Sequence, residues 1–323
     1  MSSSNAVKDS NSTQFSKYPE PLVVKPIGEH KQTFIVLHGR GSIAQKFAEP
    51  FLSHPISPLP NVEPPSVSLT IRSCFPHAKF VFPTASLRRA AIYRRSLTHQ
   101  WFDNWSLDRP EYRQELQIEG LGETSAFIHS LLQKEIDDVG AGNVILVGLS
   151  QGCAASLISL LTWQGEPIAA AVGMCGWLPL RRRMAQSAQD TNCTDEDDPF
   201  EHSEDENPFD DEGLVSNSES GKLGQVVDWL RDELEMDPDT TFREVPFQRI
   251  PVFLGHGTED EKVSCELGRR AASFLGDLGV DLHWNEYKGL GHWYSGDMLR
   301  DIVAFLNSLE GWKVDSYNVT KAL

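Results

Sequence analysis

Long apolar runs and a secretion leader are both missing from the sequence. No stretch approaches the roughly 20 apolar residues that a membrane-spanning helix needs. The first residues, Met1 to Asn5, have neither the basic nor the apolar region of a signal peptide, and Ser2 stands where a myristoylation site needs glycine. We therefore expect a cytoplasmic protein with at most transient contact with a membrane surface.

Cysteine is scarce, and its spacing indicates neither a disulfide framework nor a metal site. The five cysteines are widely separated, odd in number, and form no CxxC or Cys/His cluster. Reduced thiols are the simplest interpretation, which agrees with a cytoplasmic location. We expect no bound metal.

Basic residues are outnumbered, with 29 Lys and Arg against 46 Asp and Glu, a net charge of −17. Nucleic acid is therefore not expected as a partner, because its phosphates would be repelled. Thirteen of the acidic residues lie between Asp190 and Glu219, where there is no Lys or Arg. We predict a solvated, disordered loop there. The alternative is that these acids pair with the four arginines of 84–99.

Short apolar runs that end at Gly or Pro alternate with segments of helical periodicity. This pattern predicts an α/β fold, with a mostly parallel central sheet and helices on both faces. We expect a disordered lead-in over 1–20, a single domain over 21–311 with an acidic insertion at about 181–245, and a tail over 312–323. The predicted strands lie near 34–39, 79–83, 143–148, 168–174, 251–257 and 281–287, and the predicted helices near 111–138, 153–163, 223–234, 265–278 and 298–309. In the first helix, Gly120 and Gly122 are expected to cause a break or bend.

The segment Gly148-Leu-Ser-Gln-Gly152 matches the pattern G-x-S-x-G. An apolar strand precedes it directly and a helical segment follows it. A sharp strand-to-helix turn lifts the hydroxyl of the central serine above the edge of the sheet. This context makes Ser150 a candidate nucleophile.

A serine nucleophile of this kind needs an acid and then a histidine further along the chain. Asp260 follows the strand near 251–257, with Glu259 as its rival one residue away. His292 follows the last predicted strand, directly after Gly291, and is the candidate base. His283 lies inside that strand and is interpreted as structural.

A second glycine-rich turn, His38-Gly-Arg-Gly41, follows the first predicted strand. Backbone N–H groups at such a turn stabilise the oxyanion that forms during acyl transfer. We predict that the N–H groups of Arg40 and Gln151 form this oxyanion hole. The chemistry that these residues indicate needs no cofactor.

These motifs resemble those of the acyl-protein thioesterase/carboxylesterase family, which has the α/β-hydrolase fold. The resemblance spans about 33–309 and rests on seven segments in family order: Leu37-His-Gly-Arg-Gly, Phe75-Pro-His-Ala, Trp101-Phe-Asp, Gly148-Leu-Ser-Gln-Gly, Cys175-Gly-Trp-Leu-Pro-Leu, Gly255-His-Gly-Thr-Glu-Asp and Gly291-His. It implies Ser150, Asp260 and His292 as a catalytic triad, and so favours Asp260 over Glu259. It also implies an apolar acyl channel lined by Trp177 and Leu178, with Trp101 as a further substrate-binding residue.

The resemblance implies a serine hydrolase that cleaves acyl thioesters or esters, foremost an acyl-protein thioesterase acting on an acylated protein. The alternatives are a carboxylesterase or lysophospholipase acting on small esters or lipids, and an inactive hydrolase-fold scaffold. The chain departs from the family at Arg40, where a small or apolar residue is usual, and at Cys153, where Gly or Ala is usual. Nothing in the sequence indicates the oligomeric state.

Overall fold

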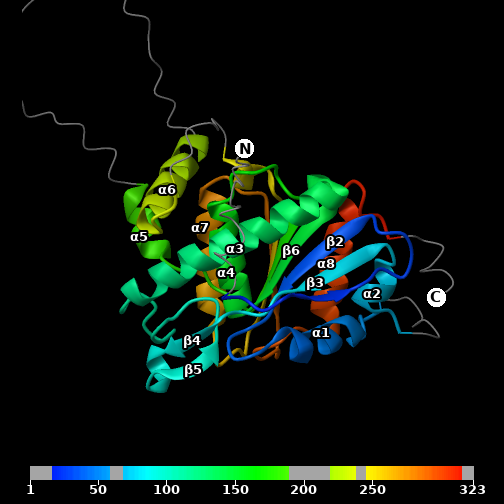
Figure 1. Ribbon diagram of the computed structural model, residues 1–323, viewed down its shortest axis with the longest axis horizontal. Coiled ribbons are helices and arrows are strands. Elements are labelled where there is room, and N and C mark those ends of the chain that lie inside the picture. The colour runs from blue at the N-terminus through cyan, green and yellow to red at the C-terminus, as the bar shows by residue number, and fades with distance from the viewer. Residues whose placement is uncertain (1–16, 59–67, 189–218, 238–244, 315–323) are drawn as a thin grey trace, which may run out of the picture.

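A seven-stranded sheet forms the centre of the molecule in the computed structural model, which describes residues 17–58, 68–188, 219–237 and 245–314 (Figure 1). The strand order is β1-β3-β2-β6-β7-β8-β9, and only the edge strand β1 is antiparallel to its neighbour. The strands are β1 Leu22–Val24, β2 Gln32–Leu37, β3 Ala78–Phe82, β6 Val144–Leu149, β7 Ala170–Met174, β8 Val252–Gly257 and β9 Leu282–Tyr287. The predicted mostly parallel sheet is confirmed.

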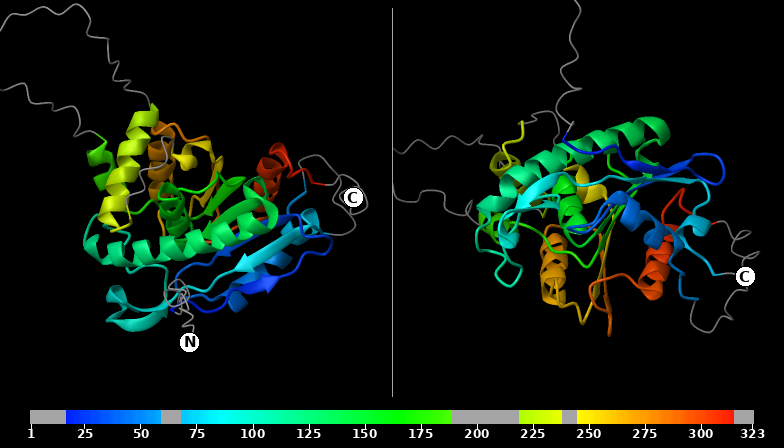
Figure 2. Two further views of the ribbon diagram at one scale, coloured as in Figure 1. Left: turned by 45° about the horizontal axis from the view of Figure 1, so that its top comes forward. Right: turned by 60° about the horizontal axis from the view of Figure 1, so that its bottom comes forward.

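Helices cover both faces of the sheet, because the strands are apolar on both sides. In β2, Ile35 and Leu37 face one core, and Phe34 and Val36 face the other. The first core is covered by α3 Glu115–Val139, α4 Gln151–Leu161, α5 Arg181–Ser187, α6 Glu219–Glu233 and α7 Cys265–Asp277, and the second by α1 Ala44–Ser53, α2 Ile71–Cys74 and α8 Gly296–Ser308. Figure 1 shows α3 in front of the sheet and α8 behind it, and Figure 2 shows the same two layers from other sides.

Helix α3 corrects one prediction from the sequence. It runs unbroken from Glu115 to Val139, through Gly120 and Gly122. These glycines serve packing instead: a Cβ on Gly120 would lie 2.7 Å from Phe102 Cα, and one on Gly122 would lie 2.9 Å from the carbonyl oxygen of Leu234. The helix stays regular, and the absence of side chains at these two glycines lets the neighbouring backbone approach it closely.

The ends of the predicted insertion belong to the core. Met184 of α5 and four residues of α6 are buried with α3 and α4, namely Leu223, Val226, Val227 and Leu230. Arg183 joins the two helices by donating to both carboxylate oxygens of Glu233, at 2.7 and 2.6 Å. The acidic stretch between them falls almost wholly outside the described residues, as do 1–16 of the predicted lead-in and 315–323 of the predicted tail.

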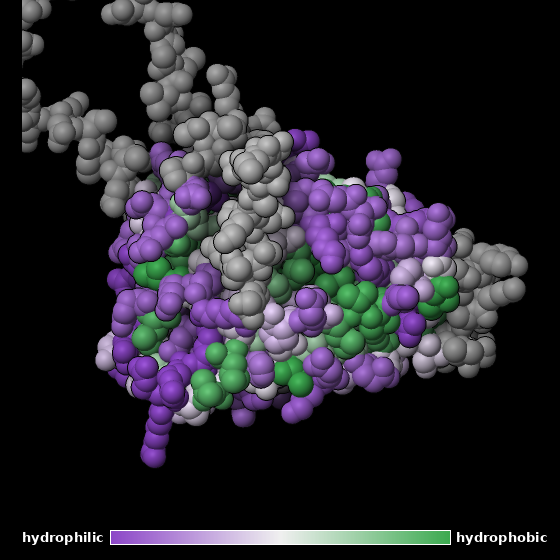
Figure 3. All heavy atoms as spheres, in the orientation of Figure 1, coloured by the Kyte–Doolittle hydropathy of each residue, from purple (hydrophilic) through white to green (hydrophobic). Residues whose placement is uncertain are grey.

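A hairpin that the sequence analysis did not predict lies beside the sheet. It consists of β4 Leu87–Ala90 and β5 Ser96–His99, joined through the 3-10 turn Ala91–Tyr93. Leu87 and Leu97 are exposed on it, and Figure 3 shows hydrophobic side chains among hydrophilic ones in this region. One of the four arginines of this region, Arg88, forms its ion pair with Glu123 of α3.

Among the described residues, no helix combines the length and the apolar character that crossing a membrane requires. The longest, α3, has 25 residues, but charged side chains interrupt it repeatedly. Helices of this kind pack one face against the sheet.

Candidate active site

The turn between β6 and α4 holds Ser150 in a conformation that is strained for a residue with a side chain. Its φ is 58° and its ψ is −120°, and its N–H donates to the carbonyl oxygen of Met174 at 2.8 Å. Gly152 makes this turn possible, because a Cβ there would lie 2.5 Å from the carbonyl oxygen of Leu37. Strain of this kind is stored at functional sites. It places Ser150 at the carboxyl edge of the sheet.

Two loops at the same edge bring His292 and Asp260 to Ser150. His292 Nε2 lies 2.8 Å from Ser150 Oγ, and His292 Nδ1 lies 2.7 Å from Asp260 Oδ2. Because the carboxylate can only accept, Nδ1 carries the proton, and Nε2 is free to accept from the hydroxyl. The three side chains form one continuous chain of hydrogen bonds.

The Asp260 carboxylate is surrounded by N–H donors. Oδ1 accepts from the backbone N–H groups of Lys262 and Val263 at 2.9 and 2.8 Å. Oδ2 accepts from His292 and lies 3.2 Å from Nε2 of His256. Burial alone would raise the pKa of this carboxyl, but the hydrogen bonds outweigh burial and hold the pKa well below its ordinary range. Asp260 is therefore ionised at neutral pH.

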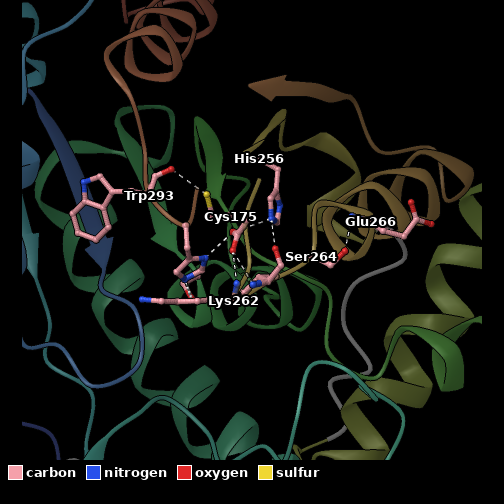
Figure 4. Close-up of polar contacts among 10 residues, drawn as sticks. Cys175, His256, Lys262, Ser264, Glu266 and Trp293 are labelled. Atoms are coloured by element: carbon pink, nitrogen blue, oxygen red, sulfur yellow. Dashed lines mark hydrogen bonds and ion pairs between the residues drawn. The ribbon is translucent and has the colours of Figure 1, made fainter. Parts of the chain in front are cut away.

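His256 is a residue of this site that the sequence analysis missed. It is fully buried in β8, and its Nε2–H donates to the carbonyl oxygen of Val263 at 2.8 Å while facing Asp260 (Figure 4). It thus links Asp260 and Val263 of the acid loop, residues 258–264, to β8. Its position four residues before the acid was the available signal, because both side chains belong to one strand-to-loop connection.

We expect His256→Phe to lower kcat about tenfold with little change in KM, because Asp260 loses a donor and the acid loop loses an anchor. Steady-state kinetics checks this effect. His256→Gln keeps an N–H donor and should recover most of kcat, whereas equal losses in the two variants would contradict a positioning role.

His38 supports the turn that carries Arg40. Its ring is fully buried, Nδ1–H donates to the carbonyl oxygen of Gly39 at 2.7 Å, and Nε2 accepts from the N–H of Ala85 at 3.1 Å. Burial lowers the pKa of His38 to about 4. The imidazole is therefore neutral at physiological pH.

Because His38 is buried in its neutral form, we expect the folded protein to become less stable at acid pH. Between its unfolded pKa of about 6.5 and its folded pKa of about 4, the unfolded chain binds a proton that the folded chain does not. The free energy of unfolding therefore falls as the pH falls through this window, by about 3 kcal/mol from His38 alone. Urea unfolding at pH 7 and at about pH 4.5 measures the difference. His38→Gln should reduce the dependence by about half, because His129, whose pKa burial also lowers to about 4, keeps its own contribution, and an unchanged slope would contradict the prediction.

A pocket of about 430 Å³ opens beside Ser150. Of the predicted site residues, Arg40, Gln151, Trp177, Ser150 and His292 line it. Residues that the sequence analysis did not single out also line it, namely Phe47, Tyr93, Leu107, Lys262, Val263 and Trp293. The lining thus combines polar groups with apolar and aromatic side chains, and the latter suit an acyl chain.

Two predicted substrate-binding residues lie elsewhere. Trp101 is fully buried outside the pocket lining, where its Nε1–H donates to the carbonyl oxygen of His38 at 2.8 Å and its backbone N–H donates to Gln151 Oε1 at 3.1 Å. Leu178 lines a separate small cavity with Pro110. Through these two hydrogen bonds Trp101 supports the turn that carries Arg40 and orients the side chain of Gln151, without lining the pocket.

One group of metal-type ligands occurs in the described part of the chain. Atoms of Cys175, Asp260 and His292 lie within 4.8 Å of one another. Hydrogen bonds already use all three: the Cys175 thiol donates to the carbonyl oxygen of Trp293 at 3.2 Å, and burial raises its pKa to about 12. A protonated thiol is a poor metal ligand. The cluster is better explained as part of the hydrogen-bond network around His292.

Comparison with known proteins identifies the family. The model of the phospholipase/carboxylesterase family matches residues 65–201 and 235–310, well over half of the chain. The chain belongs to this family. As a phospholipase/carboxylesterase family member it is a hydrolase of the α/β-hydrolase fold.

Relatives of this phospholipase/carboxylesterase chain carry thioesterase names. The chain is 24% identical to acyl-protein thioesterase 1 of Gibberella zeae, covering 88% of this chain and 94% of that protein. It is also 24% identical to acyl-protein thioesterase 1 of Cryptococcus neoformans, covering 79% and 76%. Among solved structures, acyl-protein thioesterase 2 of Zea mays superimposes with a TM-score of 0.56 at 22% identity, covering 90% of this chain and 99% of that one. Esterase PE8 has the same fold, with a TM-score of 0.55 at 20% identity, covering 91% and 99%.

Proposed function

We propose that this family member is an acyl-protein thioesterase in which Ser150 is the nucleophile, His292 the general base and Asp260 the acid that orients the base. The observation that carries the proposal is the hydrogen-bond chain from Ser150 Oγ through both nitrogens of His292 to Asp260 Oδ2, at 2.8 and 2.7 Å. Its geometry suits nucleophilic catalysis by a serine.

The reaction proceeds in two steps. Ser150 Oγ attacks the acyl carbonyl while His292 Nε2 takes the hydroxyl proton, and Asp260 stabilises the imidazolium that forms. The tetrahedral intermediate collapses, the bond to the leaving thiol or alcohol breaks, and His292 returns the proton to that leaving group. In the second step His292 removes a proton from water, which attacks the acyl-serine; the bond to Ser150 Oγ then breaks, His292 returns the proton to Oγ, and the carboxylic acid is released.

The backbone N–H groups of Arg40 and Gln151 are the proposed oxyanion donors. Gln151 is the first residue of α4, so no preceding helical turn accepts its N–H. Arg40 belongs to the turn that His38 and Trp101 hold by hydrogen bonds. Each donor is worth about 3 kcal/mol in the transition state of such reactions.

The proposed substrate is an acylated protein or a small acyl thioester or ester, with its acyl chain along Phe47, Trp177 and Trp293. The thioesterase names of the relatives support this choice. A carboxylesterase or lysophospholipase activity uses the same steps with an oxygen leaving group. The inactive-scaffold alternative is disfavoured by the intact hydrogen-bond chain.

A fluorophosphonate probe combined with a matched substrate panel tests the proposal. Wild-type protein should become phosphonylated, and peptide mass spectrometry should place the adduct on Ser150. An octanoyl thioester and the octanoyl ester of the matching alcohol then separate the two activities through kcat/KM. A label on another serine, or hydrolysis without a label, would count against the proposal. Faster turnover of the ester would favour the carboxylesterase alternative.

A further inference from the structure

The charged residues that line the pocket beside Ser150, apart from His292, are both cationic. They are Arg40 and Lys262, and no Asp or Glu is among the lining residues that the structure describes. This composition opposes that of the chain as a whole, in which acidic residues outnumber basic ones by 46 to 29. The side chains that line the pocket thus supply two cations and no described acid.

Arg40 is held at the pocket wall, and none of the carboxylates that the structure describes forms an ion pair with it. Its Nη1 donates to Asn104 Oδ1 at 3.0 Å, and its guanidinium carbon lies 5.4 Å from the ring centroid of Tyr93. Asn104 Oδ1 also accepts from Gln151 Nε2 at 3.3 Å, which fixes the amide. A guanidinium has five N–H donors, so these contacts orient it and leave donors for a ligand.

Lys262 lies on the acid loop, next to the residues that hold His292. Its backbone N–H donates to Asp260 Oδ1 at 2.9 Å, while its side chain is exposed. Figure 4 shows this side chain extending away from His256 toward the side of the site on which Trp293 lies. Within the described segments, no carboxylate comes within ion-pair distance of its ammonium, whereas Arg183, Arg269 and Arg300 each contact one.

We propose that Arg40 and Lys262 recognise an anionic group, a carboxylate or a phosphoryl group, on the leaving-group half of the substrate. This inference rests on the proposed function, because it assigns the substrate class of the same site. The apolar and aromatic side chains of the lining suit the acyl half, which leaves Arg40 and Lys262 for the other half. His292 must reach the leaving atom to protonate it, and Lys262 is on the loop that holds His292. Arg40 supplies the planar donors that match carboxylate and phosphoryl oxygens.

Three thioesters with the same octanoyl chain test this proposal. Their leaving thiols are mercaptoacetate, mercaptomethylphosphonate and the neutral mercaptoacetamide. We expect wild-type kcat/KM to be about tenfold higher for the better anionic substrate than for the amide at low salt, mainly through KM. The better of the two anions identifies whether a carboxylate or a phosphoryl group is preferred. Added salt should reduce the ratio, because it screens exposed charges.

The anion-to-amide ratio also separates the effect of the cations from any common effect on the triad. Arg40→Gln and Lys262→Met should each lower the ratio about threefold, and the double variant should abolish it. Arg72→Gln on α2 and Lys222→Met on α6 are the matched controls, because both residues are exposed and outside the pocket lining. Both controls should keep the wild-type ratio.

The outcomes distinguish this proposal from the function on which it rests. A wild-type ratio of one or less overturns the recognition of anions, and so does a ratio that survives the double variant. In both cases hydrolysis of the amide and labelling of Ser150 leave the hydrolase proposal standing. If no thioester is hydrolysed and Ser150 stays unlabelled, the proposed function itself fails.

Discussion

Replacing Ser150 by alanine should lower kcat about 10⁵- to 10⁶-fold, with little change in the free energy of unfolding. The hydroxyl is the atom that attacks, and His292 has no other side chain to activate at that position. Stability is kept because the exchange removes one partly buried hydroxyl, while the N–H of Ser150 still donates to Met174 and His292 still donates to Asp260. Single-turnover kinetics with an octanoyl thioester, together with urea unfolding, measures both quantities.

The matched control for this variant is Ser130→Ala. Ser130 lies on α3, where its hydroxyl donates to the carbonyl oxygen of Phe127, remote in sequence from the site and absent from the pocket lining. Its removal should leave kcat unchanged. A Ser150→Ala protein that turns over at more than about a hundredth of the wild-type rate would remove Ser150 from the nucleophile role.

Asp260→Asn should lower kcat about 10⁴-fold while KM stays near its wild-type value. The two backbone donors at Lys262 and Val263 would continue to bind Oδ1, so the amide nitrogen of the new side chain would face His292. An N–H donor there requires Nδ1 to accept, which moves the imidazole proton to Nε2. His292 then cannot accept the proton of Ser150.

Glu259→Gln is the control that discriminates between the two candidate acids. Glu259 is exposed, whereas Asp260 is buried against both histidines. We therefore expect near wild-type kcat from Glu259→Gln. A greater loss from Glu259→Gln than from Asp260→Asn would show that the acid has been assigned to the wrong residue. The pH profile of kcat for both variants completes the comparison.

Features encoded by neighbouring residues could be predicted from the sequence. The apolar run before Ser150, the glycines around it and the helix after it specify one turn. All of these residues are neighbours in the sequence, so the turn could be recognised without knowing which distant segments contact it. The buried strands could also be predicted, because consecutive residues such as Phe34 and Ile35 are apolar and face opposite sides of the sheet. The positions of Asp260 and His292 followed from a general rule for parallel sheets, that loops after the strands meet at one edge.

Features that depend on distant packing could not be predicted. Gly120 was expected to break its helix, because nothing near it in sequence indicates that Phe102 will lie against it. Trp101 was expected at the substrate, yet an aromatic motif in the sequence does not reveal whether its ring lines a pocket or packs behind a turn. Lys262 escaped notice for the same reason, since its importance comes from the pocket that Arg40 and Trp293 share with it.

The pairing of α5 with α6 has a consequence for how this chain can vary. Because Arg183 and Glu233 hold the two helices together, and both helices are anchored in the core, the connection between them joins two fixed points of the fold. Closing a longer connection between such points costs free energy that grows only with the logarithm of its length. The junction is therefore a permissive site, where natural length variation, a reporter tag or a grafted domain can be accommodated without moving the β6–α4 turn.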